Sequence, residues 1–567
     1  MPNSGSTVFR NVCPLDCPDT CGMRVTVKDG LAIDLRGDAE HPFTRGFLCQ
    51  KMARYLDRVY SPDRLMLPMK RVGAKGSGRF ERISWDEALE TVTARFAEIA
   101  ASADGPQAIL PYSFCGTMGK LQSSSLDHRF FHRLGASKLD RTICATAGSL
   151  GYEYTNGRGR LGADPLAVPR CKFLVNWGSN TVNTNSHLWS LMVQARKTNR
   201  ATIVTIDPYR SPTAFRSDWH IAIRPGTDAA LALGLMHVIW TEGLQDDDYL
   251  SKGTIGAPAL RERVLADYAP ERIAAITGVD VNTIEVLARR LAQEQPSLIR
   301  LNYGMQRHRG GGMAVRTIAC LPAIIGSWRY PGGGVLLSTS GAYDFANDRL
   351  TRPELSPPGT RTINMNELDK ALAGELPGPP VRALYVYNSN PAAVAPNQRK
   401  VIDGLLREDL FTIVHELFAT DTVDYADIVL PATSQLEHVD LHGSYGHHEV
   451  MYNPRAIAPL GECRSNNDVF RALAARLGFE PEFFPDDDAL IREALDGGPT
   501  LDGITLERLQ AEGSIRLNLP ADYAPFADGV FPTPSGKCEL YSERMKADGL
   551  GPLPTYIPPL EDPRTRP

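Results

Sequence analysis

Four of the ten cysteines are spaced in a way that suits metal binding. Cys13, Cys17 and Cys21 are separated by three residues each, and 27 residues lie between Cys21 and Cys49. Four cysteine thiolates, three on a tight loop and one more distant, are a recurring ligand set of iron-sulfur clusters. A four-cysteine zinc site is the alternative, although zinc sites more often use two CxxC pairs. The spacing therefore predicts a four-iron four-sulfur (4Fe-4S) cluster.

A second candidate site begins at the turn formed by Gly178, Ser179 and Asn180. This turn lies between an expected strand and an expected helix, where backbone amides at a helix N-terminus can bind phosphate. Asp207 lies 29 residues after Gly178, past the next expected strand, where a carboxylate can accept hydrogen bonds from a ribose or a guanine. The GxGxxG pattern of an NAD site is absent from this segment.

The elements that must position these residues alternate between strand and helix. Short apolar or β-branched runs are typical of buried strands at 172–177, 202–206, 298–304, 383–388 and 411–414. Helices are predicted after a capping box at 84–87, from 227 to about 240, and from 467 to 477. Such alternation predicts parallel sheets with right-handed crossovers. The fold class is therefore a multi-domain α/β protein, with a small N-terminal iron-sulfur module followed by doubly wound, Rossmann-like domains.

Length and charge limit the remaining possibilities. A chain of 567 residues needs three or four domains, and a net charge of -5 does not indicate nucleic acid as a partner. No run approaches the roughly 18 apolar residues of a membrane-spanning helix, and the N-terminus lacks signal features. We therefore expect no direct membrane insertion and a cytoplasmic location, where cysteines serve as thiols or ligands rather than in disulfides.

Three regions follow from the composition along the chain. Residues 1–65 form the cysteine-bearing module, which ends near a Gly- and Lys-rich connector at 70–80. Residues 66–525 form the α/β region, which the family resemblance described below divides into two intertwined domains with nucleotide sites at about 170–240 and 380–440. Residues 526–567 are rich in Pro and Gly and are expected to be a linker.

The sequence resembles the large catalytic subunit of the molybdopterin oxidoreductases of the dimethyl sulfoxide reductase family. The cysteine pattern matches the family's cluster module, and Lys51 stands two residues after the last ligand, where the family places a lysine between the cluster and a pterin. The stretch 207–240 is similar to the family's guanine- and phosphate-binding segment. Further similar blocks lie at 303–312, 331–334, 387–397 and 415–438.

The resemblance implies a bis-molybdopterin guanine dinucleotide cofactor that carries molybdenum or tungsten. The resemblance also implies which residues contact the pterins and nucleotides. Beyond the turn at Gly178, Ser179 and Asn180 and beyond Asp207, these residues are Gly226, Thr227, Asp228, Gly304, Met305, Asn390, Pro391, Glu416 and Thr420. Glycine permits the close approach of backbone to phosphate, although each of these glycines could equally serve a tight turn.

Cys144 stands where this family presents its protein ligand to the metal. A soft thiolate suits a metal that is also bound by the dithiolene sulfurs of two pterins. Formate dehydrogenases follow this ligand with a histidine, whereas this chain has Ala145, which argues against formate. The resemblance slightly favours a thiosulfate- or polysulfide-like substrate over a nitrate-like one. Possible proton or anion handlers are His132, Arg158, His308, His442, His447 and His448.

The predicted function is an oxidoreductase that transfers an oxygen atom or an electron pair on a small substrate, with Cys144 and Lys51 as its catalytic residues. An electron-transfer protein or subunit is the expected partner. Three alternatives stay open: formate dehydrogenase-like activity, a non-catalytic electron-transfer subunit, and non-redox hydroxyl transfer. The family's C-terminal dinucleotide-binding barrel is expected to be absent, because the sequence ends soon after the segment 531–545 that leads into it.

The other five cysteines lack mutual ligand spacing and are predicted to be buried, small apolar residues. They are Cys115, Cys171, Cys320, Cys463 and Cys538.

Overall fold

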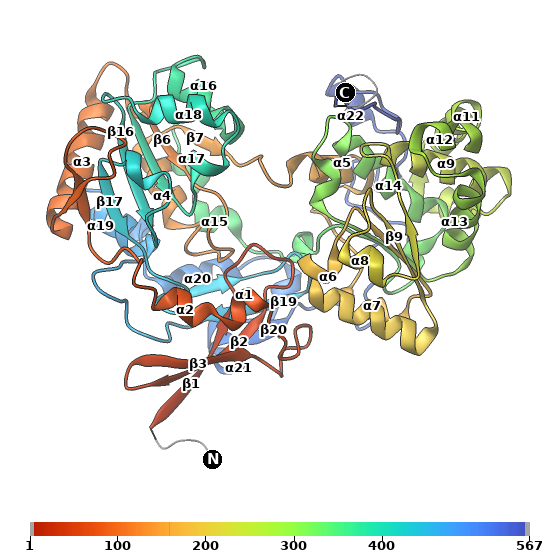
Figure 1. Cartoon of the computed structure of the whole chain (residues 1–567), viewed down its shortest axis with the longest axis horizontal. Helices are drawn as coiled ribbons and strands as arrows, with labels where there is room; N and C mark the ends of the chain where they lie inside the picture. Colours follow the sequence, from red (N-terminus) through yellow and green to blue (C-terminus); the bar gives the residue numbers. More distant parts are fainter. Residues whose placement is uncertain (1–4, 158, 562–567) are drawn as a thin grey trace.

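Two α/β lobes stand side by side above a small N-terminal module (Figure 1). The structure is a computed structural model that describes residues 5–157 and 159–561. One lobe contains a five-stranded sheet, the other a six-stranded sheet, and the module contributes a three-stranded sheet. The predicted α/β fold class with an N-terminal module is confirmed.

The N-terminal module is an antiparallel sheet followed by two short helices. Its elements are β1 (Ser6–Val12), β2 (Gly22–Lys28), β3 (Leu31–Gly37), α1 (Gln50–Ala53) and α2 (Tyr55–Val59). Alternate residues of β2, including Met23 and Val25, are buried against Met52 of α1 and against Leu436, far along the chain. This packing attaches the module to the six-stranded lobe. The nine-residue loop 13–21 between β1 and β2 carries three of the four predicted cluster ligands.

The five-stranded sheet is parallel throughout, in the order β10-β9-β8-β12-β13. Its strands are β8 (Phe173–Trp177), β9 (Thr202–Ile206), β10 (Trp219–Ile221), β12 (Ser297–Leu301) and β13 (Gly334–Leu336). The strands predicted at 172–177, 202–206 and 298–304 are confirmed as β8, β9 and β12.

Helices cover both faces of this sheet, as the alternation along β8 requires. Phe173, Val175 and Trp177 of β8 belong to a core shared with α9 (Asp228–Thr241), α13 (Val281–Gln293) and α14 (Gly311–Ile324). Leu174 faces the other way, toward α7 (Ser186–Asn199). Because both faces are buried, the strand is apolar except at Asn176.

The six-stranded sheet is mixed, in the order β5-β4-β17-β16-β15-β6. Its parallel strands are β6 (Ile109–Tyr112), β15 (Ala383–Tyr387), β16 (Phe411–Glu416) and β17 (Ile428–Pro431), and β4 (Met69–Arg71) and β5 (Phe80–Arg82) are antiparallel additions. The strands predicted at 383–388 and 411–414 are therefore confirmed. The Gly- and Lys-rich connector forms the turn between β4 and β5 and so belongs to the edge of this sheet.

Helices also sandwich the six-stranded sheet. Tyr385 of β15 packs toward α3 (Trp85–Ala101), α4 (Leu126–Leu134) and α19 (Asn466–Arg476), whereas Leu384 packs toward α16 (Leu368–Ala373) and α18 (Gln398–Leu405). The capping box is confirmed in part, because the Glu87 amide donates to Ser84 Oγ at 3.1 Å. The helix predicted at 467–477 is confirmed as α19.

The segment after residue 525 packs against the five-stranded lobe rather than extending from it. Phe526, Phe531 and Leu540 are buried there, and β21 (Cys538–Glu539) pairs in parallel with β11 (Thr254–Ile255). The short helix α22 (Glu543–Ala547) follows. Among residues 5–157 and 159–561, no helix is both long enough and apolar enough to cross a membrane.

Candidate functional site

The loop between β1 and β2 brings three cysteines together, and α1 supplies the fourth. The Cys13 amide donates to the Cys21 carbonyl at 2.9 Å, which closes the loop, and Cys49 stands at the N-terminal cap of α1. Burial raises the pKa of the Cys13 thiol to about 12, and the nearby Cys49 raises it further. Burial likewise raises the pKa of the Cys21 thiol, and the nearby Cys13, Cys17 and Cys49 add to this rise. The four sulfurs therefore share one environment.

This environment suits a bound metal group. All four thiols are free, and burial raises the pKa values of Cys13 and Cys17, which favours the neutral form of these two thiols in the absence of a bound cation. Bound iron would supply that cation. Ligands of one zinc ion must lie about 2.3 Å from a common point. In the described part of the chain, no three His, Cys, Asp or Glu side chains are arranged to hold one ion.

Cys144 lies on a loop that hydrogen bonds from the segment after β12 hold in place. The Gln306 side chain donates to the Cys144 carbonyl, and Arg307 donates to the Ile143 carbonyl at 2.8 Å. Burial raises the pKa of the Cys144 thiol and Asp16 adds to the rise, whereas Arg307 opposes it with a hydrogen bond. The sulfur thus faces both a carboxylate from the cysteine loop and a cation from the loop after β12.

A cavity of about 290 Å³ opens beside Cys144. Its walls come from distant parts of the chain: Asp16 from the cysteine loop, residues 113–124 after β6, Arg160, and Tyr445. The Tyr445 hydroxyl donates to Asp16 at 2.8 Å, so the two lobes and the module meet at this wall. The cavity is therefore a candidate substrate pocket within reach of both the predicted metal ligand and the cluster loop.

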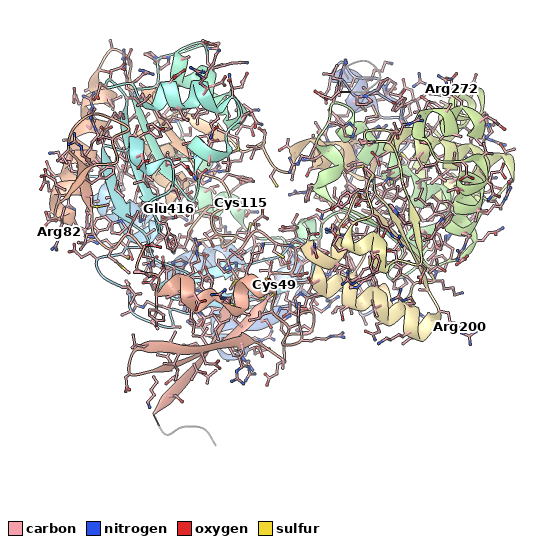
Figure 2. All side chains as sticks on the ribbon, viewed as in Figure 1. Cys49, Arg82, Cys115, Arg200, Arg272 and Glu416 are labelled. Carbon is pink, nitrogen blue, oxygen red and sulfur yellow. The ribbon has the colours of Figure 1, made fainter. Side chains whose placement is uncertain are left out.

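The prediction that Cys115 is a buried core residue is wrong. Cys115 is half-buried, lines the Cys144 cavity, and also lines a second cavity of about 300 Å³ (Figure 2). Its φ of +67° is a left-handed conformation that is rare for residues other than glycine, and this turn directs the chain between the two cavities. The other four cysteines in that group are buried as predicted.

The first predicted nucleotide site assembles at the carboxyl ends of β8, β9 and β12. A side chain on Gly178, whose φ is +60°, would meet the Met305 methyl group at 3.0 Å. A side chain on Gly304 would have only the Gly178 carbonyl within 4 Å, so the space above this backbone is open. Trp177 Nε1 donates to Asp228 Oδ1 at 2.9 Å.

The remaining residues of this site are close by. Burial raises the pKa of Asp207, and a side chain on Gly226 would meet His308 Nδ1 at 3.4 Å. The Thr227 hydroxyl donates to the Arg224 carbonyl at 2.7 Å, which fixes the turn before α9. The structure thus brings together residues from four separate segments, as a dinucleotide site at the switch point of a parallel sheet requires.

The second predicted site lies at the carboxyl ends of β15 and β16. Asn390 caps the short helix α17 (Pro391–Val394), and Pro391 is buried at its first position. Asn390 and Glu416 both line the 300 Å³ cavity, and Figure 2 labels Glu416. Burial raises the pKa of the Glu416 carboxyl. Thr420 is half-buried on the loop after β16.

The two sites share one hydrogen-bond motif. Asn180 Oδ1 accepts from Thr213 Oγ1 at 2.8 Å and from the Thr213 amide at 3.3 Å. Asn390 Oδ1 accepts from Thr422 Oγ1 at 2.7 Å and from the Thr422 amide at 3.2 Å. In both sites, the threonine hydroxyl also accepts from the amide two residues after the asparagine, at 2.9 Å and 3.1 Å.

Each asparagine follows the end of one parallel strand, and each threonine follows the next strand in sequence. The sequence analysis missed Thr213 and Thr422. The signal that could have found them is the similar offset, 33 and 32 residues, from the asparagine at each strand end.

The second cavity fits a polar ligand because its walls contain buried polar atoms without partners. Within the described residues these are His415 Nδ1, Ser434 Oγ, Gln435 Oε1 and His438 Nε2. Thr420 Oγ1, on the same loop as Glu416, also lacks a partner. Leaving such groups unsatisfied costs about 1–3 kcal/mol each, so a ligand with many donors and acceptors, as a pterin or a nucleotide has, suits this cavity.

The remaining predicted residues lie elsewhere. Lys51 is exposed on α1, two residues after Cys49. His442, His447 and His448 are buried, and His132 lines a separate cavity. Arg158 lies outside the described residues.

Comparisons with known proteins agree with this arrangement. A family model described as molybdopterin oxidoreductase matches residues 64–476, and one for the molybdopterin oxidoreductase Fe4S4 domain matches residues 6–61. The probable oxidoreductase YoaE of Bacillus subtilis is 46% identical over 559 residues, which cover 98% of this chain and 81% of the relative.

More distant relatives extend the comparison. Dimethyl sulfoxide reductase DmsA of Escherichia coli is 28% identical over 645 residues, which cover 98% of this chain and 77% of the relative. The solved structure of acetylene hydratase from Pelobacter acetylenicus matches with a TM-score of 0.80 and 26% identity, covering 98% of this chain and 81% of that one. The similarity therefore extends over the cysteine module and both lobes.

Proposed function

Because the chain belongs to the molybdopterin oxidoreductase family, as the sequence resemblance predicted, we propose that it transfers an oxygen atom or an electron pair on a small substrate at a metal bound by Cys144. The family makes it an enzyme with a 4Fe-4S cluster and a molybdenum-pterin cofactor. One observation supports the finer proposal above all. Cys144 lines a cavity that also reaches the cluster loop at Asp16 and shares a wall, at Cys115, with the second predicted nucleotide site.

The proposed cofactor is the bis-guanine dinucleotide form. The two asparagine-threonine motifs support this form, since each fixes a turn at the carboxyl end of a parallel strand, where nucleotides bind. Asp207 would accept hydrogen bonds from the first nucleotide, and Glu416 from the second. When bound, the metal and its pterins would supply two-electron chemistry, and the cluster would carry electrons one at a time.

The chain's own residues prepare the site in three ways. Arg307 favours the thiolate form of Cys144, which is the form that ligates a metal. Gln306 fixes the Cys144 backbone and so positions the sulfur. Lys51, proposed to lie between cluster and pterin, would stabilise negative charge during electron passage. An electron-transfer protein or subunit would complete the path.

Acceptors of the thiosulfate, polysulfide or nitrate kind are the proposed substrates. A second candidate is non-redox hydration, which the similarity to acetylene hydratase favours. The two differ in their need for electrons. Oxidoreduction requires an external donor or acceptor in stoichiometric amount, whereas hydration continues in its absence.

The first experiment is to measure metal and pterin in anaerobically purified protein. We expect about four irons, one molybdenum or tungsten and two guanine nucleotides per chain, as the proposed cofactor set requires. Iron without the other metal would instead favour an electron-transfer subunit without catalysis. Turnover is then assayed twice, once with a reduced dye as the electron donor and once without any electron donor.

The ligand assignments need matched variants. Cys144→Ala should abolish turnover and keep the cluster spectrum, whereas Cys320→Ala, which changes a buried cysteine on α14, should keep both. Cys17→Ala should lower the iron content. Retained activity in the first variant would refute Cys144 as ligand, and unchanged iron in the last would refute the cluster site.

A further inference from the structure

The cavity beside Cys144 contains more positive than negative charge. Lys120, Arg141 and Arg160 line it, and Asp16 is the acidic residue among its described lining residues. The hydroxyl-bearing residues Thr117, Ser124, Tyr303 and Ser340 also line it. Cations and hydroxyl donors together are the groups that bind oxyanions in proteins.

The three cations are held by neutral groups. Arg141 donates to the Ser113 carbonyl at 2.9 Å and to Ser113 Oγ at 2.7 Å, and Arg160 donates to Ser149 Oγ at 3.2 Å. Lys120 lies over the ring of Phe345 and donates to Asn347 Oδ1 at 3.3 Å. In the part of the chain that the structure describes, no carboxylate forms an ion pair with any of the three. Their charges are positioned but not neutralised.

Two of these charges repel each other. Burial lowers the pKa of the Lys120 ammonium, and the nearby Arg160 lowers it further. Asp440, the carboxyl group nearest Lys120, offsets this lowering in part, although burial raises its own pKa to about 8. A site that gathers like charges in a partly enclosed space is stabilised when an anion enters it.

We propose that Lys120 and Arg160 are specificity-determining residues that select a small anionic substrate, with an oxyanion group bound next to Cys144. This inference rests on the proposed function, because it concerns the same cavity, and it assigns the selection of an anion to two named side chains. Arg160 presents a planar fork that can bind two oxygens of one group, and Lys120 supplies a point charge. The hydroxyl groups around them would complete the shell of donors.

The same cations could instead bind a phosphate of the cofactor, so the test must separate the two sources. The variants are Lys120→Gln and Arg160→Gln in the cofactor-loaded enzyme. Lys120→Arg retains the charge, and Arg289→Gln removes a surface arginine on α13 that pairs with Glu242 and Glu285. For each protein, the metal and pterin content is measured first. Thiosulfate, nitrate and the neutral dimethyl sulfoxide are then titrated by calorimetry at low ionic strength.

We expect the wild type to bind at least one of the two anions. Lys120→Gln and Arg160→Gln should weaken that binding about 10- to 100-fold, the range for loss of one charge-assisted hydrogen bond, without changing cofactor content. Lys120→Arg should recover most of the affinity. Dimethyl sulfoxide should bind all variants equally, and Arg289→Gln should match the wild type.

Three results would overturn the inference: no anion binding by the wild type, equal affinities in all variants, or loss of pterin from the glutamine variants. The last would assign the cations to the cofactor. Failure of the proposed function is a separate result, since it appears as missing molybdenum and tungsten in the wild type before any titration.

Discussion

Asp440 offers a sharp test of how burial controls charge near the proposed site. Its side chain is wholly buried, and Oδ1 accepts the amides of Leu121 and Leu441 at 2.8 Å each. Oδ2 has no partner among the described residues, and a side chain on Gly119 would lie 1.7 Å from it. Burial raises the pKa of this carboxyl from 3.8 to about 8. Asp440 should therefore be neutral in the folded protein at pH 7.

The sign of the pH effect follows from linkage. Between pH 4 and pH 8 the unfolded state loses the Asp440 proton while the folded state keeps it, so folding stability falls as the pH rises. Each pH unit costs about 1.4 kcal/mol, and the full window about 6 kcal/mol. Asp440→Asn keeps the two accepted hydrogen bonds and cannot ionise. The variant should therefore gain stability relative to the wild type as the pH rises.

The assay is thermal unfolding of both proteins, matched for iron content, from pH 5 to pH 8. This interval corresponds to about 4 kcal/mol. At about 2.1 cal/mol/K per residue, the melting temperature of the variant should rise by about 3 °C relative to the wild type, and by more if only one lobe unfolds cooperatively. Asp502→Asn, at an exposed carboxyl, should follow the wild type at every pH.

Parallel melting curves for Asp440→Asn and the wild type would refute this reasoning. They would mean that Asp440 is ionised in the folded state and paired with a cation. Lys120 is the cation that faces it, and Asp487 is the nearby carboxylate that opposes ionisation.

Three further predictions concern other parts of the fold. Asn180→Ala and Asn390→Ala should each halve the guanine nucleotide released per chain, from two to one, and an unchanged ratio would contradict the paired sites. Glu437→Gln leaves the charge of Arg64 buried and should cost about 3–5 kcal/mol, seen as a lower urea midpoint, because both side chains are fully buried and 2.9 Å apart. Ser84→Ala removes the cap of α3 and should cost about 1 kcal/mol in the same measurement, whereas no change would mean that water replaces the cap.

Much of the fold could be predicted because its signals are local. The strands β8, β9, β12, β15 and β16 are short runs rich in apolar and β-branched residues, and a strand that is buried on both faces can be recognised from such a run alone. The cap of α3 was readable from Ser84 and Glu87, since the contact spans three residues. The family could also be predicted from the sequence, because the blocks that resemble it are short, continuous segments. Domain boundaries and individual site residues stay predictions.

The site could be predicted only in part, because its geometry joins distant segments. The sequence placed Cys115 in the core, whereas packing of the turn after β6 exposes it to two cavities. The pairing of Asn180 with Thr213 and of Asn390 with Thr422 depends on which strands become neighbours. The sequence predicts a connector at 70–80 and a linker after 525, whereas in the structure the first forms a turn at a sheet edge and the second packs against a core.

By itself, the sequence determined the chemistry available to this protein: thiols at cluster spacing, turns that suit phosphate, and a family. Spacing along the chain is enough for that, because each signal lies within a few tens of residues. Only the tertiary structure decided which side chains meet at the cavity beside Cys144. Asp16, Lys120, Arg160 and Tyr445 are far apart in sequence, and the packing of the two lobes and the module brings them to one space. The charge of that cavity is therefore a property of the folded chain.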